Sequence, residues 1–108
     1  MEKFVLKGVN GQLYIHENKV EITRKGTLGF LTNGLSGLKT LPMKNIVSIQ
    51  VKYGTAFTNG YIQFNTLGKS ESTGGLFNAI QDENTVVFKK KQNDLARQIK
   101  DYIEQIIL

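Results

Sequence analysis

Apolar and polar residues alternate with a period of two along several short segments of the chain, which is typical of half-buried β-strands. Leu13 and Ile15 show this alternation, and Val20 and Ile22 show it again after a turn around Asn18. Asparagine suits a turn because it tolerates a positive φ and its side chain bonds the nearby backbone. These residues predict a β-hairpin.

Further segments with strand-like composition or the same alternation predict more strands. They are residues 4–6, 37–41, 47–53, 61–65 and 85–88. Asn59 and Gly60 lie between two of these segments and form a dipeptide that strongly favours a tight hairpin turn. Pro42 ends another strand, because proline has no N–H to donate to a central ladder.

Only the C-terminal segment has the 3.6-residue period of an amphipathic helix, which we expect over residues 93–107. Asn93 is a suitable N-cap, and Asp94 stands in the first turn, where a negative charge is favourable. The apolar stripe consists of Leu95, Ile99, Tyr102, Ile103 and Ile106. We expect this stripe to be buried against the strands.

The fold class that these elements predict is mainly β, with one domain over residues 1–108. Six or seven antiparallel strands are too many for one flat sheet with an exposed apolar face, so they should curl into a small barrel or sandwich. The C-terminal helix would then cap an open end of it.

Two glycine-rich stretches do not fit this pattern: residues 25–39 and 67–83. Loops of this length are uncommon in a compact domain unless they have a function. Their leucines and phenylalanines either join the core as a satellite cluster or form a surface for a partner. The sequence leaves both interpretations open.

Composition excludes most enzyme chemistry. The chain has no cysteine and a single histidine, His16, so it offers neither a thiolate nucleophile nor a Cys/His cluster for zinc. His16 falls on the polar phase of its strand, so we expect a surface histidine. We therefore predict no enzyme, no metal, no cofactor and no small-molecule substrate.

Two segments imitate catalytic or nucleotide-binding motifs. Residues 29–36 follow the spacing of a phosphate-binding loop, but Leu35 replaces the lysine and no helix pattern follows. Asp82 and Glu83 are adjacent carboxylates, which point in opposite directions on an extended chain and more simply form a turn before Thr85. Neither segment predicts chemistry.

The net charge is +5, with basic residues dispersed from Lys3 to Lys100 and one run at residues 89–91. Such a balance favours weak attraction to anionic partners such as nucleic acid or a lipid surface. The possible contact residues are Lys25, Lys39, Lys89, Lys90 and Lys91. Among aromatic residues, Phe64 falls in the core phase, which leaves Tyr61 and Phe57 for base stacking.

Three blocks, residues 33–46, 58–64 and 82–88, resemble a bacterial and phage domain of unknown function. The resemblance covers most of the chain and implies a fold like that of pleckstrin-homology domains. That family often carries a short C-terminal helical hairpin, which is absent after Leu108, and a truncated chain would explain this. The resemblance brings no catalytic residues.

Phosphoinositide-binding pleckstrin-homology domains cluster basic residues around the first hairpin loop. If residues 16–19 are that loop, its single lysine and its glutamate make a poor headgroup site. We therefore expect a non-enzymatic adaptor that binds a protein or oligomerises through a sheet edge, the groove beside the helix or the glycine-rich loops. The alternative is weak binding to anionic surfaces. Without a long apolar segment or signal peptide, we expect a cytoplasmic location.

Overall fold

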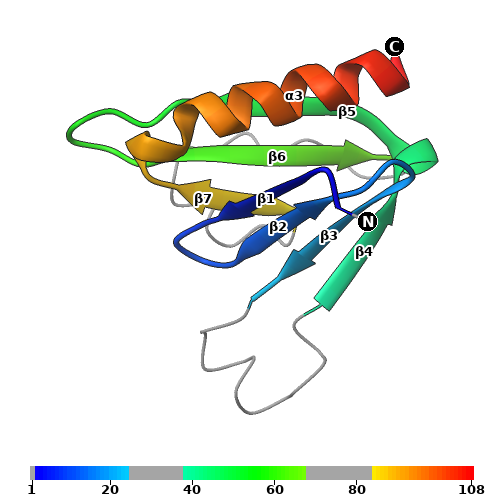
Figure 1. Ribbon diagram of the computed structural model, residues 1–108, viewed down its shortest axis with the longest axis horizontal. Coiled ribbons are helices and arrows are strands. Elements are labelled where there is room, and N and C mark those ends of the chain that lie inside the picture. The colour runs from blue at the N-terminus through cyan, green and yellow to red at the C-terminus, as the bar shows by residue number, and fades with distance from the viewer. Residues whose placement is uncertain (1, 25–37, 68–83) are drawn as a thin grey trace.

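The computed structural model describes residues 2–24, 38–67 and 84–108. In these residues two antiparallel sheets and one long helix form a layered molecule (Figure 1). The four-stranded sheet consists of β1 (Phe4–Lys7), β2 (Gln12–Ile15), β3 (Lys19–Thr23) and β4 (Leu38–Pro42). The three-stranded sheet consists of β5 (Ile46–Lys52), β6 (Gly60–Thr66) and β7 (Thr85–Phe88), and α3 (Asn93–Ile107) follows it. The predicted mainly β class with a C-terminal helix is confirmed.

The alternation of apolar and polar residues correctly predicts which face of the β2–β3 hairpin is buried. Leu13 lies opposite Ile22 and Ile15 lies opposite Val20, and all four side chains are buried. The intervening turn is closed by a hydrogen bond of 2.9 Å from the His16 N–H to the Lys19 carbonyl. Alternation therefore fixes both the register and the inward face of this hairpin.

The sheets form a sandwich and do not close into a barrel, so of the two predicted forms only the sandwich is correct. They are joined covalently through a 3-10 turn, η2 (Met43–Asn45), between β4 and β5. At another corner the Val9 N–H donates to the Val87 carbonyl at 2.7 Å, and the Arg24 side chain donates to the Thr85 carbonyl at 3.1 Å. Among the described residues these are isolated bonds between the sheets, without a ladder of paired strands.

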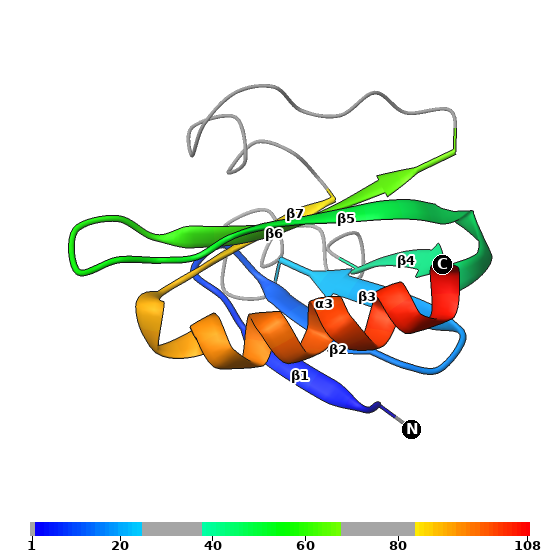
Figure 2. The same cartoon turned by 90° about the horizontal axis from the view of Figure 1, so that it is seen from above.

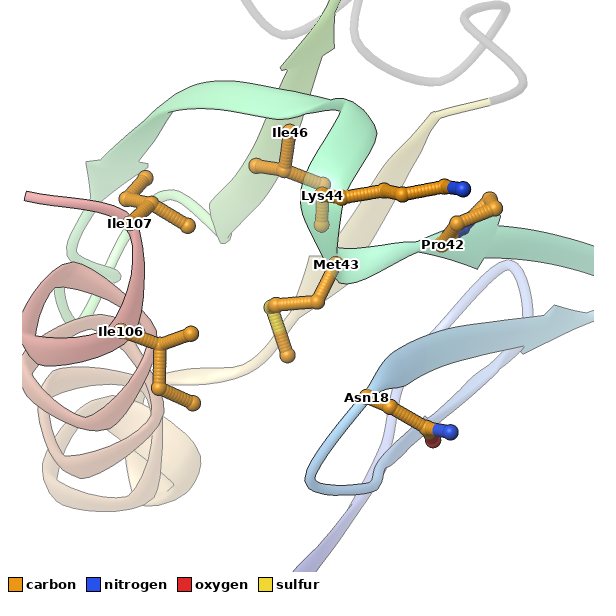
Figure 3. A pocket seen from close by; sticks show the side chains of 7 residues that line it. All are labelled: Asn18, Pro42, Met43, Lys44, Ile46, Ile106 and Ile107. Atoms are coloured by element: carbon orange, nitrogen blue, oxygen red, sulfur yellow. The ribbon is translucent and has the colours of Figure 1, made fainter.

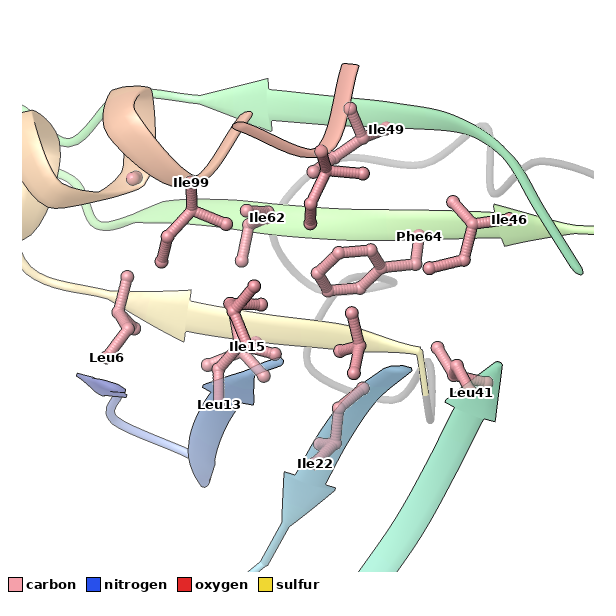
Figure 4. Close-up of a cluster of buried hydrophobic side chains, with 14 of the residues drawn as sticks. Leu6, Leu13, Ile15, Ile22, Leu41, Ile46, Ile49, Ile62, Phe64 and Ile99 are labelled. Atoms are coloured by element: carbon pink, nitrogen blue, oxygen red, sulfur yellow. The ribbon is translucent and has the colours of Figure 1, made fainter. Parts of the chain in front are cut away.

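One apolar core lies between the sheets and under the helix (Figure 4). It takes side chains from both sheets and from α3, including Leu6, Leu13, Ile15, Ile22, Leu41, Ile46, Ile49, Ile62, Phe64 and Ile99. α3 lies along the open side of the sandwich beside β5, and its Tyr102 ring packs edge-on against Phe4 of β1 at 5.6 Å between centroids (Figure 2).

The predicted helix boundaries are confirmed, but two details of the helix differ from expectation. Ala96, Ile99 and Ile103 are the buried residues of α3, whereas Ile106 is 44% exposed and lies outside the core. Asn93 is not an N-cap: it has helical φ and ψ and follows a 3-10 turn, η3 (Lys90–Gln92). Its side chain reaches the β5–β6 loop instead.

The Asn59–Gly60 turn prediction is wrong. β5 ends at Lys52 and β6 begins at Gly60, with Lys52 directly opposite Tyr61, so the connection spans residues 53–59. Gly60 is required by a close approach, because a Cβ there would lie 2.3 Å from the Lys52 carbonyl oxygen. The dipeptide marks the start of a strand here and not the centre of a turn.

A second hairpin assignment also needs correction. The first hairpin of the chain is β1–β2, whose turn is closed by a 2.8 Å bond from the Gly8 N–H to the Gly11 carbonyl. Residues 16–19 form the turn of the second hairpin, so they are not the first hairpin loop, around which phosphoinositide-binding domains cluster their basic residues. The structure describes only residues 38, 39 and 67 of the two glycine-rich stretches. The segment at 29–36 and the pair Asp82 and Glu83 lie wholly outside the described residues.

Candidate functional site

An apolar pocket of about 670 Å³ opens where the last turn of α3 meets the corner between the two sheets (Figure 3). We call it the helix-end pocket. It is lined by Asn18, Pro42, Met43, Lys44, Ile46, Ile106 and Ile107. Three separate parts of the chain meet there: the β2–β3 turn, the η2 corner and the end of the helix.

The floor of the helix-end pocket is fixed by the corner between β4 and β5. Met43 and Ile46 are buried, and the Met43 N–H donates to the Asn18 carbonyl at 2.9 Å, which ties the corner to the β2–β3 turn. Pro42 brings β4 to its end just before this corner. The floor is thus set by backbone bonds before any ligand arrives.

The wall of the pocket belongs to α3. Ile106 keeps 44% of its surface exposed, although the other isoleucines of the helix stripe, Ile99 and Ile103, are fully buried. Asn18 and Lys44 provide a polar rim. An apolar concavity with a few polar groups at its edge binds an apolar side chain and offers one cationic partner for a neighbouring acid. None of the lining residues is a carboxylate, hydroxyl or imidazole that would support catalysis.

The opposite end of the molecule carries the lysine run. Lys89, Lys90 and Lys91 are exposed and border the β5–β6 loop across a hollow of about 390 Å³ that also contacts Phe57. Lys89 and Lys91 border a second hollow with Lys7 and the β1–β2 turn. We call Phe57 and these four lysines the basic tip.

The other predicted contact residues do not join the basic tip. Lys39 lies in β4, opposite Ile22, on the strand at the other edge of the four-stranded sheet from β1, and it lines neither hollow. Lys25 lies outside the described residues. The lysine that the sequence did not single out is Lys7, which the β1–β2 hairpin brings to the run.

The loop that carries Phe57 is closed by its own hydrogen bonds. The Thr55 N–H donates to the Thr58 carbonyl at 2.8 Å, and Thr55 Oγ1 accepts from the N–H groups of Phe57 and Thr58 at 3.2 and 3.0 Å. The ring of Phe57 is 96% exposed. A short self-bonded loop therefore presents one aromatic side chain to solvent.

The loop is also braced against the helix. The Gly54 N–H donates to Asn93 Oδ1 at 2.8 Å, and Asn93 Nδ2 donates to the Gly54 carbonyl at 3.0 Å. A Cβ at Gly54 would lie 3.0 Å from the backbone nitrogen of Lys90, so the loop and η3 are in close backbone contact. Phe57 and the lysine run are consequently held as one surface.

Of the remaining predictions, the one for Phe64 is confirmed, whereas Tyr61 and His16 differ from expectation. Phe64 is buried in the core as expected, but Tyr61 is only 9% exposed, so it is not free to stack on a base. His16 Nε2 lies 2.8 Å from Glu21 Oε1, and its side chain is 14% exposed. His16 is therefore partly buried and hydrogen-bonded to Glu21 beside the β2–β3 turn, and is not a free surface histidine. In residues 2–24, 38–67 and 84–108 no group of three or more His, Cys, Asp and Glu residues is placed to hold a metal ion.

Charged side chains on the outward face of α3 pair with other side chains of the same helix. A hydrogen bond from Arg97, with a second from Gln98, lowers the pKa of the Asp94 carboxyl below its ordinary value. Glu104 accepts two hydrogen bonds from Lys100 Nζ at 2.9 and 3.0 Å and raises the pKa of that lysine. Such pairs at helical spacing support the helix. The described part of the chain contains no helix with the length and apolarity to span a membrane.

A comparison with protein-family models matches residues 14–104 to DUF4429, a domain of unknown function. The chain belongs to this family. The match extends from within β2 to Glu104 in α3, so it includes strands β3 to β7 and most of the helix. It leaves out β1 with Lys7, and the last residues of α3 with Ile106 and Ile107. No curated protein and no solved structure matches the chain.

Sequence reasoning missed most of the DUF4429 helix-end pocket. Met43 and Ile46 lie in the block 33–46 that resembles the family, but that block gives no sign of a pocket, which forms only at the corner between the sheets. The exposed Ile106 was placed in the core because it follows the stripe at helical spacing. Phe57, by contrast, is a residue that the sequence analysis names, as an aromatic side chain free to stack on a base.

Proposed function

We propose that this DUF4429 chain is a non-enzymatic adaptor that binds a protein segment in the helix-end pocket. The observation that carries the proposal is the exposed Ile106 beside a preformed apolar floor of Met43 and Ile46. The matching segment has an apolar anchor side chain for the floor and an acidic residue for Lys44. A second copy of this chain is the alternative occupant.

The pocket is favoured over the exposed edge of β4 as the interaction site. β4 contains Lys39 as its second residue and Pro42 at its end, and both residue types protect an edge strand from pairing with another chain. β4 is also only five residues long. The edge therefore offers few donors and acceptors to an added strand, whereas the pocket offers apolar area to bury.

A display library of peptides with variable apolar and acidic positions tests this proposal. We expect the purified chain to select peptides with one large apolar residue and a nearby acid. Ile106→Asp should weaken the selected peptides by about tenfold or more, because the anchor then meets a charge in an apolar wall. Leu38→Asp is the matched control, since Leu38 is similarly exposed, at 47%, and lies on β4 away from the pocket.

The following outcomes decide whether the chain is an adaptor that binds through the helix-end pocket. Equal loss with both variants, or no loss with either, would contradict the pocket as the binding site. Sedimentation of the chain over a range of concentrations identifies a second copy as the occupant if it shows self-association that Ile106→Asp abolishes. Selection of no peptide together with a monomer at every concentration would overturn the proposal.

We also infer that the fold is of the pleckstrin-homology type. A four-stranded sheet, then a three-stranded sheet, then one C-terminal helix supports this inference, together with the resemblance of residues 33–46, 58–64 and 82–88 to that bacterial and phage family. A bacterial or phage origin, a cytoplasmic location, association with a helical-hairpin module and the absence of enzymatic activity are parts of the same proposal. An experimental structure that superposes on pleckstrin-homology domains throughout both sheets tests the fold.

A further inference from the structure

The basic tip combines positive charge with an exposed ring at one end of the molecule. Lys7, Lys89, Lys90 and Lys91 border two adjoining hollows, and Phe57 stands at the apex of the loop beside them. Asp94, in the first turn of α3, is bonded to Arg97 and Gln98. The acid nearest to the run in sequence therefore has its own partners and leaves the lysines available to an external anion.

The loop can enter a less polar environment at low cost. The N–H groups of Thr55, Phe57 and Thr58 are already bonded within the loop. Removing water from an unpaired N–H is expensive, and for these three groups that cost is avoided. The ring of Phe57, at 96% exposure, gains free energy when it leaves water.

The tip is held in place before it meets a surface. Asn93 binds both backbone groups of Gly54, so the loop is fixed to the start of α3. Lys89, Lys90 and Lys91 lie on η3 and on the residue before it, directly beside this brace. Little conformational freedom is therefore lost when the ring and the lysines act together.

We propose that the basic tip docks this protein on an anionic lipid bilayer, with Phe57 in the headgroup and acyl boundary and the lysines against the lipid headgroups. An anionic bilayer binds protein surfaces that combine an apolar residue with several lysines, and each lysine near the bilayer adds to the attraction. The docking surface lies at the opposite end of α3 from the helix-end pocket (Figures 1 and 2). It is thus a further function that does not depend on the adaptor proposal.

A lipid surface fits the tip better than nucleic acid does. Proteins that bind single strands stack bases on aromatic faces along a groove. Tyr61 of the adjoining strand is nearly buried, and Tyr53, which is 42% exposed, lies near Arg97 and Lys100 of α3. Phe57 is therefore the ring at the apex of the projecting loop. A projecting ring enters a soft planar interface, whereas stacking needs a platform.

Tryptophan fluorescence tests the docking, because the chain contains no tryptophan and a single one is a unique reporter. We expect Phe57→Trp to shift its emission to shorter wavelength on vesicles of phosphatidylcholine with about a quarter phosphatidylglycerol, and not on phosphatidylcholine alone. Val47→Trp is the control, since Val47 is half exposed at the far end of β5. Its emission should stay unchanged.

Flotation of the same vesicles measures the contributions of charge and ring. Changing Lys89, Lys90 and Lys91 together to Gln should weaken binding by on the order of a hundredfold, since each lysine near such a surface contributes about fivefold. Phe57→Ala should weaken it by roughly tenfold. Ile106→Asp should leave it unchanged, which separates this test from that of the pocket.

Two outcomes would overturn the docking. One is that neither reporter shifts and no protein floats with anionic vesicles at about 50 mM salt, where electrostatic binding is strong. The other is that Phe57→Trp is quenched by an oligonucleotide while vesicles have no effect, which would assign the tip to nucleic acid. Circular dichroism of each variant checks that the fold is retained.

Discussion

Ile99 and Ile103 hold α3 on the sandwich. Both are fully buried, one helical turn apart, in the core that the two sheets share. Ile106 continues their spacing but lies beyond the last covered turn, where the pocket opens. Three isoleucines of the same stripe therefore have two different roles, and their energetic contributions should differ accordingly.

Truncation of these residues measures the difference. Ile99→Ala or Ile103→Ala should lower the free energy of unfolding by about 2–5 kcal/mol, because each leaves a cavity and loses transfer energy. Ile106→Ala should cost less than about 1 kcal/mol. Chemical denaturation of the three variants is the measurement. A loss below about 1 kcal/mol for both Ile99 and Ile103 would mean that the stripe is exposed in solution.

Asn93 is the residue that joins the β5–β6 loop to the helix. Asn93→Ala should cost about 1–3 kcal/mol, because the buried Gly54 loses the partners of both its N–H and its carbonyl. Asn93→Asp keeps the acceptor for the Gly54 N–H and should lose less. Denaturation midpoints give these values, and equal stability of all three proteins would show that the brace does not hold in solution.

At the level of the elements, strands and helix were predictable because each has a regular period. The β2–β3 hairpin and the helix at 93–107 follow directly from spacing. The role of Asn93 and the length of the β5–β6 loop were not predictable, since both depend on a contact between segments that lie 39 positions apart. The helix-end pocket was hidden for the same reason: it forms only where two sheets and a helix end meet.

The start of α3 gives a prediction about pH. The lowered pKa of Asp94 means that its carboxylate stabilises the folded state above its ordinary pKa of 3.8, and that this stabilisation is lost as the pH falls through the lowered value. Asp94→Asn should therefore be less stable than the parent near neutral pH. In strongly acidic solution the two proteins should converge. Paired urea titrations at the two pH values test this, and an unchanged difference would contradict the assigned bond with Arg97.

At the scale of the whole molecule, two different surfaces lie at the two ends of one helix. α3 has 15 residues, so at about 1.5 Å per residue its ends are roughly 22 Å apart. One end is apolar and concave, and the other is basic and projecting. A partner in the pocket and an anionic bilayer at the tip are therefore able to bind at the same time without contact.

Salt should separate the two activities. Attraction of the lysines to an anionic surface is screened as ionic strength rises from about 50 to 200 mM, whereas burial of an apolar anchor is not. We expect vesicle flotation to fall steeply over this range while peptide affinity stays within about twofold. Parallel anisotropy and flotation at both salts test this, and a peptide affinity that falls as steeply would assign the pocket's binding to charge alone.

Ligand screening by thermal shift should find no saturable stabilisation by zinc, ATP or GTP at micromolar concentration. The described residues hold no metal-ligating cluster, and Leu35 replaces the lysine that a phosphate-binding loop requires. A ligand that binds the native state must raise its melting temperature by mass action. A saturable rise with any of the three would contradict the non-enzymatic binding module.

Titration of amide correlation spectra with a selected peptide tests the helix-end pocket most directly. The account predicts that the shifted amides cluster at Asn18, at residues 43–46 and at the last turn of α3, and that Ile106→Asp removes the shifts. Amides of the basic tip should stay in place. Shifts that cluster at residues 54–59, or along β4 without the end of α3, would contradict the claim that this pocket is the binding site.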